Sequence, residues 1–386
     1  MKLNRNVVAF TGGGTAGHIY PGLAVADELK DIAGKKSELR IIWIGCSKGM
    51  DKKIVENAFG PAGKKTAACF YGIPSGKLRR YFSWQNFSDM FRIIAGYFKA
   101  KKILRKEKPC MLFSKGGFVS VPPCLAAKHL GIPVFTHECD FTLGLANRLN
   151  FKSADKMFVS YEETKKRLSQ KEQKKVIVTG NPVRPVFYDT KPERGLKFLG
   201  IDENHKKPVL LILGGSSGAR QINQLVTENL EWLCKNFIVV HQSGLLNNDD
   251  NLEKQLHKKY KENYKAYQFI YEQMPDVVSC ADVILSRAGA NSIWEAAVLY
   301  KPMVLIPLCG SGTRGDQVDN ARFFEEKKVA LVLVGDDACS QKLIDSLSVM
   351  LTKKSRDSFS KNIKEMVGER NSAKIIAGEL YDVINN

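Results

Sequence analysis

The sequence lacks long hydrophobic runs and any ordered cysteine pattern. None of its apolar stretches reaches the roughly 18–20 residues that a membrane span requires, and a glycine-rich loop interrupts the first apolar run too early for a secretory signal peptide. The nine cysteines are scattered and never form C-x-x-C, so neither a disulfide framework nor a zinc site is expected. These absences predict a cytoplasmic protein.

Several nucleotide-binding motifs are also missing. Residues 12–17 spell G-x-G-x-x-G, but His18 and Ile19 follow where a Walker A loop needs Lys and then Ser or Thr. A dinucleotide site needs an acidic residue at the tip of the second strand, and residues 45–49 (GCSKG) contain none. No D-x-D occurs, so a metal-chelated nucleotide is not indicated. We expect no metal site and no required cofactor, and the sequence leaves open whether a divalent cation assists.

The sequence does contain a repeated alternation of apolar runs and helical patterns. Continuous runs rich in β-branched residues are typical of parallel strands that are covered on both faces. In the first half these runs are VVAF (7–10), RIIWIG (40–45), CMLFSKGG (110–117), PVFTHE (133–138), KMFVS (156–160) and VIVTGNP (176–182). In the second half they are PVLLILGGSSG (208–218), FIVVHQSG (237–244), YQFIYEQM (267–274), DVILSRAGA (282–290), PMVLIPL (302–308) and VALVLVG (329–335). The pattern predicts an α/β fold.

This alternation restarts near Lys207, after a polar stretch that contains proline. We therefore predict two Rossmann-like, doubly wound domains, at residues 1–185 and 207–354, facing a cleft. A linker is expected at 186–206. The remaining segment, 355–386, is predicted to be helical, and it either packs on its own domain or crosses back to the first.

Four junctions of strand, glycine loop and helix indicate phosphate binding. They lie at residues 10–30, 114–123, 214–223 and 286–297. Glycine lets backbone N–H groups approach an anion, and a helix N-terminus attracts negative charge. Each junction alone is compatible with a simple tight turn. Four of them in two similar domains favour a site for a donor diphosphate and an acceptor diphosphate.

Two ionisable residues beside these loops are candidates for chemistry. His18 is a candidate general base, because a neutral imidazole can take a hydroxyl proton near pH 7. Glu295 lies one turn into the helix after SRAGA, where a carboxylate can accept hydrogen bonds from both hydroxyls of a ribose. The alternatives are a structural histidine and a carboxylate that only stabilises its helix N-terminus.

Taken together, these motifs resemble a known family. GGGTAGHIYPGLAVA, GGFVSVPP, HECDFTLGLANR, TGNPVR, LGGSSGARQIN, SRAGANSIWEA and DQVDNA occur in one order between residues 12 and 321. The set is similar to the MurG family of GT-B glycosyltransferases. That resemblance implies transfer of N-acetylglucosamine (GlcNAc) from UDP-GlcNAc to lipid I, which gives lipid II for peptidoglycan synthesis. It also implies an inverting displacement, in which the 4-hydroxyl of the N-acetylmuramyl residue attacks the anomeric carbon.

The resemblance further implies roles for individual residues. Gly14, Gly116 and Gly117 would bind the acceptor diphosphate, with His18 as the candidate base and Glu138 as the spare candidate. The residues that would bind the donor are Thr15, Ala16, Gly17, Asp140, Arg184, Ser216, Tyr271, Glu295 and Gln317. Within that set, Glu295 would hold the ribose, Ser216 the diphosphate and Gln317 the sugar hydroxyls. Backbone groups near Ile270 and Tyr271 would read the uracil.

The chain departs from the family pattern at one sugar contact. Many members have HEQN where this chain has HECD (137–140), so Asp140 stands where the family has Asn. Aspartate accepts hydrogen bonds but cannot donate an amide one. Ala16, where many members have glycine, is a smaller departure.

Positive charge is concentrated between residues 77 and 108. The chain has a formal charge of +19, and this stretch holds ten Lys and Arg against two acids. Its first part predicts a membrane-surface patch, formed by Leu78, Arg79, Arg80, Phe82 and Trp84. The alternative to a membrane patch, for the second part, is a helix that packs on the domain and exposes its Lys and Arg residues to water. The expected partners are UDP-GlcNAc, lipid I and an anionic membrane surface, with the protein peripheral on the inner face of the cell membrane.

Other functions remain as alternatives. A nucleic-acid-binding module would use the same charges, but it leaves the glycine loops unexplained and no such motif appears, so no nucleic-acid partner is expected. A membrane scaffold with decayed loops is disfavoured by the intact His18, Glu295 and Gln317. The nearest alternative is a GT-B transferase that uses a different lipid, such as diacylglycerol.

Overall fold

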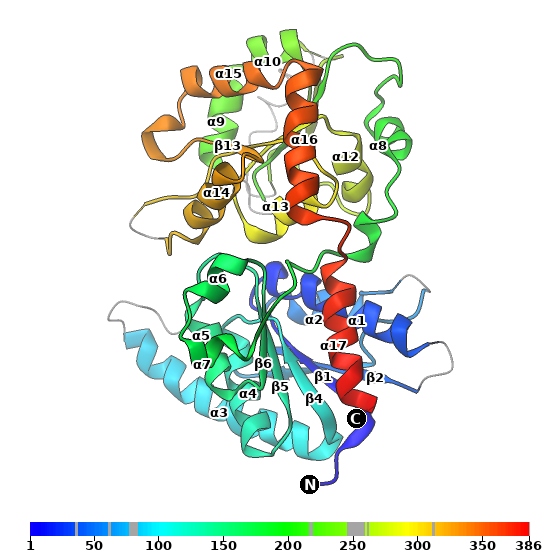
Figure 1. The fold of residues 1–386 in the computed structure, drawn as a ribbon, viewed down its shortest axis with the longest axis vertical. Helices are drawn as coiled ribbons and strands as arrows, with labels where there is room; N and C mark the ends of the chain where they lie inside the picture. Colours follow the sequence, from blue (N-terminus) through cyan, green and yellow to red (C-terminus); the bar gives the residue numbers. More distant parts are fainter. Residues whose placement is uncertain are drawn as a thin grey trace. The chain divides into compact units, whose positions relative to one another are not determined.

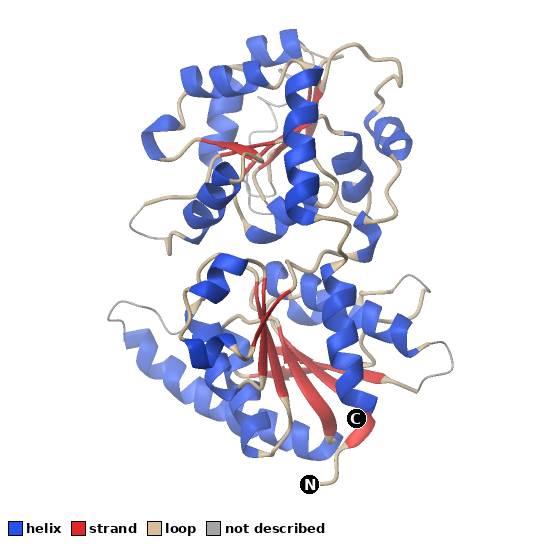
Figure 2. Cartoon of the chain, in the orientation of Figure 1, coloured by secondary structure: helices blue, strands red, loops and turns tan. Residues whose placement is uncertain are grey.

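The chain forms two compact α/β units. The structure, a computed structural model, describes residues 1–34, 38–60, 63–76, 84–215, 219–244, 259–260, 262–310 and 313–385. One unit contains Met1–Pro185 and Arg370–Asn386, and the other contains Val186–Glu369. Each unit has a parallel sheet flanked by helices (Figures 1 and 2). The predicted α/β class with two Rossmann-like domains is confirmed.

The first unit is built on a seven-stranded sheet in the order β3-β2-β1-β4-β5-β6-β7. Its strands are β1 (Asn4–Thr11), β2 (Arg40–Cys46), β3 (Cys69–Ile73), β4 (Pro109–Ser114), β5 (Val134–Glu138), β6 (Lys156–Val159) and β7 (Val176–Val178). Its helices are α1 (Tyr20–Ala33), α2 (Asp51–Glu56), α3 (Trp84–Glu107), α4 (Val121–His129), α5 (Leu145–Ser153), α6 (Glu162–Lys166), α7 (Gln170–Gln173) and α17 (Ser372–Asn385), with short 3-10 turns η1 (Ala16–His18) and η2 (Phe118–Ser120). Strand β1 lies between β2 and β4, so the loops after β1 and β4 leave the sheet at the same edge.

The second unit has a six-stranded parallel sheet in the order β10-β9-β8-β11-β12-β13. Its strands are β8 (Val209–Leu213), β9 (Ile238–Gln242), β10 (Tyr264–Tyr267), β11 (Val283–Ser286), β12 (Met303–Leu305) and β13 (Ala330–Val332). Its helices are α8 (Pro192–Leu199), α9 (Arg220–Glu228), α10 (Leu230–Asn236), α12 (Met274–Cys280), α13 (Ala290–Ala297), α14 (Asp316–Glu326), α15 (Ser340–Val349) and α16 (Lys353–Val367). The sequence suggested a strand in the run 267–274, and this position was wrong, because β10 ends at Tyr267, the first residue of that run.

The segment 186–206, predicted as a linker, is part of the second unit. It contains α8, which packs on α12 so closely that a Cβ on Gly195 would lie 2.3 Å from the carbonyl oxygen of Asp276. Arg194 also pairs with the carboxylate of Asp276, at 2.9 Å. A charged and proline-containing composition therefore marks a surface helix here rather than a free connection.

The C-terminal segment forms two helices rather than one. Helix α16 ends before Gly368, which has a φ of +66° that favours glycine. Helix α17 belongs to the first unit, where it lies along α1 (Figure 1). Its buried residues, Ala373, Ile376, Ala377 and Leu380, join the core beneath the first sheet. Of the two alternatives for this segment, the structure has the one that returns to the first unit.

Helix α3 has 24 residues, but its second half is rich in Lys and Arg. Across the described parts of the chain, no helix combines the length and the apolar character needed to cross a membrane.

Candidate functional site

Two glycine loops of the first unit lie against each other at the carboxyl edge of its sheet. A Cβ placed on Gly117 would lie 2.6 Å from the carbonyl oxygen of Gly13 and 2.9 Å from Cδ2 of His18. Gly116 and Gly117 have φ values of +85° and +79°, which favour glycine. The structure thus brings His18 into contact with the loop that was expected to bind the acceptor diphosphate.

The carboxylate of Asp51 holds the first glycine loop through backbone hydrogen bonds. Gly14 donates its N–H to Oδ1 of this buried carboxylate at 3.0 Å, and Cys46 donates to Oδ2 at 2.8 Å. A Cβ on Gly13 would lie 1.8 Å from Oδ2, so only glycine allows this approach. Burial raises the pKa of Asp51, although both backbone N–H groups oppose that shift. Because Asp51 already accepts from Gly14, the contribution of Gly14 to anion binding lies in the shape it gives the loop rather than in its amide.

Glu138, at the end of β5, is also engaged by hydrogen-bond donors. Its carboxylate accepts from the backbone of Asp140 at 3.1 Å and of Gly144 at 2.8 Å, and from Nδ2 of Asn147 at 3.1 Å. It is 3% exposed. The carboxylate therefore fixes the turn from β5 into α5, and this geometry favours His18 over Glu138 as the base.

A buried asparagine pair on α5 connects the two strands that carry the site. Asn147 accepts from the hydroxyl of Thr136 at 2.9 Å and donates to the carbonyl of His137 at 2.9 Å. Asn150 donates to the hydroxyls of Ser114 and Ser120, at 3.2 and 2.8 Å. These bonds fix the loop after β4 relative to the end of β5, which preorganises the glycine loop.

Glu138, Cys139 and Asp140 place three possible metal-ligand atoms within 4.8 Å of one another. Two observations make the cluster a poor cation site. Glu138 already accepts three N–H bonds, and the Lys115 ammonium lies close enough to Cys139 to lower the pKa of its thiol. Burial outweighs that effect and raises the pKa of Cys139 to about 12, so the thiol stays protonated.

The remaining candidates of the first unit lie on its surface and rim. Thr15 is exposed, whereas Ala16, Gly17 and His18 are half-buried in the η1 turn. Arg184 follows β7 and holds its guanidinium over the ring of Tyr20, 5.1 Å from the centroid. Asp140 is half-buried. The first-unit residues expected to touch the sugar donor are therefore accessible.

In the second unit, Glu295 and Gln317 lie on helices that follow neighbouring strands. Glu295 is a half-buried residue of α13, which begins after β11. Gln317 lies on α14, and its Oε1 accepts from the N–H of Leu308 at 2.9 Å. That bond fixes which end of the amide accepts, so the NH₂ group is the end that can donate to a ligand.

Arg287 is a cation of this unit that the sequence analysis did not single out. It directly follows β11 and donates to Oε1 of Gln221 and to the carbonyl of Ile306, both at 3.1 Å. Burial lowers the pKa of its guanidinium. The positive charge of Arg287 is thus held at the carboxyl edge of the second sheet, where the glycine junctions of this unit lie.

Tyr271 is 65% exposed, and its ring packs against that of Phe269 at a tilt of 59°, with centroids 4.6 Å apart. The neighbouring Ile270 donates its N–H to Oε1 of Gln242 at 2.9 Å, so a uracil here would be read by the Ile270 carbonyl. Other candidates lie outside the described residues, namely Ser216, Leu78, Arg79, Arg80 and Phe82. The structure describes the backbone of Trp84 but not its side chain.

Comparison with known proteins agrees with this architecture. The glycosyltransferase family 28 N-terminal domain matches residues 8–159, and the family 28 C-terminal domain matches residues 209–377. A curated relative from Treponema denticola, named UDP-N-acetylglucosamine--N-acetylmuramyl-(pentapeptide) pyrophosphoryl-undecaprenol N-acetylglucosamine transferase, is 52% identical over 86% of this chain and 84% of its own. The chain is a MurG-family member of glycosyltransferase family 28. A relative of the same name from Clostridium botulinum is 39% identical over 93% of this chain and 98% of its own.

Solved structures show the same fold for this MurG-family chain. The crystal structure of Acinetobacter baumannii MurG superimposes with a TM-score of 0.70, covers 98% of this chain and 99% of its own, and is 23% identical. A UDP-GlcNAc 2-epimerase from Neisseria meningitidis, solved with UDP-GlcNAc bound, has a TM-score of 0.65 at 17% identity. The predicted membership of the MurG family and its GT-B fold are confirmed.

Proposed function

We propose that this enzyme transfers GlcNAc from UDP-GlcNAc to the 4-hydroxyl of the N-acetylmuramyl residue of lipid I, which gives lipid II. The observation that carries the assignment is the 52% identity over 86% of the chain to a transferase named for this reaction. The motifs of both units, apart from TGNPVR (179–184), lie within the residues that the two family models match. The reaction places the protein in peptidoglycan precursor synthesis.

Binding of the donor is assigned to the second unit together with residues of the first. Glu295 would accept hydrogen bonds from the ribose hydroxyls, and the NH₂ group of Gln317 would donate to the sugar. Arg287 and the Ser216 loop would stabilise the diphosphate that leaves, because fixed positive groups are most effective where negative charge develops. Thr15, Ala16, Gly17, Asp140, Arg184 and Tyr271 complete the proposed donor contacts.

Binding of the acceptor and the proton transfer are assigned to the first unit. The Gly116–Gly117 loop would bind the diphosphate of lipid I. His18 would take the proton of the 4-hydroxyl as its oxygen bonds to the anomeric carbon. The bond from that carbon to the phosphate oxygen breaks, UDP leaves with the electron pair, and the configuration inverts. The contact of His18 with Gly117 supports this placement, since the acceptor would be held beside the base.

We also propose that the first unit works at the inner face of the cell membrane. Beyond the patch at residues 78–84, helix α3 exposes an apolar stripe of Met90, Phe91, Ile94 and Phe98. Phe91 and Phe98 are 63% and 62% exposed, and the cations Lys99, Lys101 and Lys102 follow them. Such a face suits the interface of an anionic bilayer, where the acceptor lipid resides.

Vesicle flotation tests the membrane proposal. Replacing Phe91 and Phe98 together by Ser should reduce binding to vesicles that contain phosphatidylglycerol, with little binding of either protein to phosphatidylcholine vesicles. The matched control is Val349→Ser, an exposed apolar residue of the second unit. Equal flotation of the double variant and the wild type would argue against α3 as the contact.

Acceptor choice separates the two lipid hypotheses. Labelled UDP-GlcNAc is offered with lipid I or with diacylglycerol, and the product is analysed for its linkage. A β-1,4-linked disaccharide on lipid I, with no product from diacylglycerol, is the expected result. Product from diacylglycerol alone would keep the fold and reject the proposed acceptor.

A further inference from the structure

Lys115 is a buried lysine whose ammonium group has no oxygen or nitrogen acceptor, and the weakly accepting thiol of Cys139 lies near it. It directly follows β4 and precedes the Gly116–Gly117 loop, and it is 1% exposed. Among the lysines and arginines in the described ranges, it is the only one enclosed to this degree. Its Nζ has no carbonyl, carboxylate or ring nitrogen at hydrogen-bonding distance.

The surroundings of Lys115 do not compensate its charge. The nearest ionisable groups are the thiol of Cys139 and the imidazole of His137, and the charge of Lys115 lowers the pKa of both. His137 donates from Nε2 to the carbonyl of Gly180 at 3.0 Å, and burial keeps it neutral. The carboxylate of Glu138 is engaged by its own three N–H donors. The first unit therefore holds a positive charge that its own groups leave unpaired.

The position of Lys115 is fixed by the two glycine loops. A Cβ on Gly12 would lie 3.3 Å from Cβ of Lys115, so the first loop packs on the lysine stem. On the other side, a Cβ on Gly116 would meet the amide of Asn147 at 2.8 Å. The stem of Lys115 thus lies against the first glycine loop, and its ammonium lies near His137 and Cys139.

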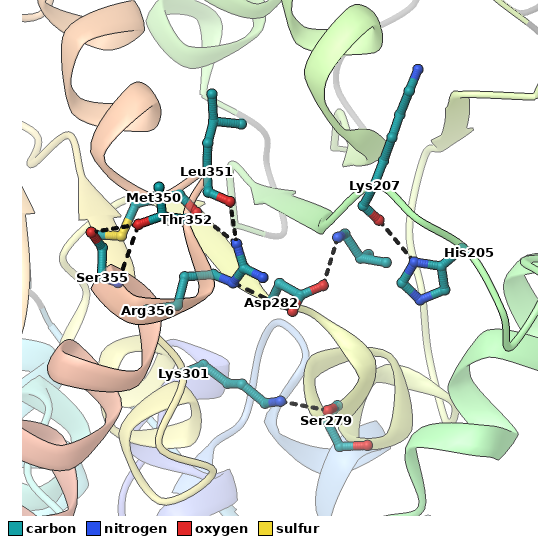
Figure 3. Close-up of polar contacts among 11 residues, drawn as sticks. His205, Lys207, Ser279, Asp282, Lys301, Met350, Leu351, Thr352, Ser355 and Arg356 are labelled. Carbon is teal, nitrogen blue, oxygen red and sulfur yellow. Dashed lines mark hydrogen bonds and ion pairs between the residues drawn. The ribbon is translucent and has the colours of Figure 1, made fainter.

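Two partly buried lysines in the described part of the second unit have oxygen acceptors. In the second unit, Lys301 donates to the carbonyl of Ser279 at 2.6 Å (Figure 3). Lys207 donates to the carbonyl of Cys234 at 2.8 Å. The guanidinium of Arg356 pairs with Asp282 (Figure 3). These partly buried cations have the oxygen acceptors that the ammonium of Lys115 lacks.

A buried and unpaired cation is costly, so its retention calls for an anion that arrives later. We propose that Lys115, which directly precedes the Gly116–Gly117 loop, is the counter-charge for the diphosphate of the acceptor and acts without touching it. The inference rests on the proposed function, because lipid I supplies that diphosphate. In this role Lys115 is a positioning residue, and the positive potential it creates at the loop favours an anionic ligand.

The test replaces Lys115 by methionine, which keeps an unbranched side chain one atom shorter and removes the charge. The KM for lipid I should rise at least tenfold, while the KM for UDP-GlcNAc stays unchanged. The midpoint of thermal unfolding should stay the same or rise, because an unpaired buried charge is gone. Opposite effects on acceptor affinity and stability are what a merely structural lysine would not produce.

The matched control is Lys301→Met, which removes a buried ammonium that has an acceptor. This variant should lower the unfolding midpoint and leave the KM for lipid I unchanged, since the Ser279 carbonyl loses its donor. If Lys115→Met fails to fold, Lys115→Gln takes its place in the same measurements. A stability loss like that of Lys301→Met, or an unchanged KM for lipid I, would overturn the proposal.

A binding measurement separates this inference from the proposed function. Geranyl diphosphate is added to the wild type in saturating UDP, which occupies the donor site, and geraniol serves as the uncharged control. The diphosphate should raise the unfolding midpoint of the wild type and do so markedly less in Lys115→Met. Equal shifts in both proteins would reject the role of Lys115, whatever the turnover assay shows. If the wild type does not turn over lipid I but the shifts differ as expected, the proposed function fails and the diphosphate site stands.

Discussion

At the residue scale, the candidate site depends on buried groups that fix the backbone around it. Asp51 accepts from Gly14 of the first glycine loop, and Glu138 accepts from the turn after β5. Asn147 bonds to β5, and Asn150 connects α5 to the residues on both sides of the second glycine loop. Such groups determine where His18 and the glycines lie. A loss of activity in a variant therefore has to be separated from a loss of structure.

The Glu138→Gln variant tests whether Glu138 is the general base or only stabilises the fold. A glutamine replaces one acceptor oxygen by an NH₂ group that faces N–H donors, so the free energy of unfolding should fall by about 1–3 kcal/mol. The kcat of the folded fraction should fall much less than in His18→Ala, where loss of a general base costs about 10²–10⁴-fold. Chemical denaturation and initial rates of transfer measure the two effects. Glu162→Gln, on an exposed turn of α6, is the control. A kcat loss in Glu138→Gln as large as that in His18→Ala, at unchanged stability, would make Glu138 the base.

Asp27 gives the first unit a pH-dependent stability. Burial raises its pKa from 3.8 to about 6, opposed by the bond from the Thr66 hydroxyl and by Lys30, with a small further increase from Glu28. The folded state therefore keeps this proton at a pH where the unfolded chain has lost it. This contribution to stability is complete below about pH 4 and is lost as the pH rises through 6.

The Asp27→Asn variant should not lose stability as the pH rises through 6. At pH 8 the variant should be more stable than the wild type by up to about 3 kcal/mol, and the difference should shrink toward zero at pH 4. Denaturant unfolding at several pH values checks this, with Asp31→Asn on the exposed face of α1 as the control. A difference that does not change with pH would show that Asp27 ionises normally in the folded protein.

At the element scale, α17 completes the first unit although it comes from the end of the chain. Ile376→Ala should lower the stability of that unit by about 2–5 kcal/mol, because this fully buried side chain leaves a cavity against the α1 side of the sheet. Ile375→Ala removes a neighbouring side chain that is 37% exposed and should cost much less. Thermal unfolding of the two variants compares them directly. Equal costs would mean that α17 does not pack as described.

Most strands were predictable from the sequence, and the exceptions have physical reasons. Apolar runs such as VVAF (7–10) and RIIWIG (40–45) predicted their strands. The segment Cys69–Ile73 was missed because most of its residues are half-buried and it contains a glycine. The helix in 186–206 was missed because charge and proline resemble a linker, and the break at Gly368 was missed because an apolar stripe continues on both sides of it.

The site was predictable only where chemistry follows a motif. The sequence predicts site residues where they stand in recognisable motifs, as for His18, Gly116, Gly117, Glu295 and Gln317. Asp51 was not predicted, because nothing in the sequence shows that it accepts a hydrogen bond from Gly14, 37 positions away. Lys115 was missed for a related reason, since its burial and lack of an acceptor appear only once the loops are folded.

At the scale of the whole molecule, function is divided between two units of the same architecture. The first carries His18 and the loops assigned to the acceptor, and the second carries the helices assigned to the nucleotide sugar. The positive charge concentrated on α3 and the preceding segment belongs to the first unit. A basic protein with this division is suited to an acceptor that is anionic and bound to a membrane.

The most direct test of the account is the initial rate of GlcNAc transfer from UDP-GlcNAc to lipid I in detergent, measured for the wild type, His18→Ala and Glu295→Ala. We expect turnover by the wild type, a loss of about 10²-fold or more in kcat for His18→Ala, and a raised KM for UDP-GlcNAc in Glu295→Ala. A wild type that neither transfers GlcNAc to lipid I nor releases UDP would contradict the account.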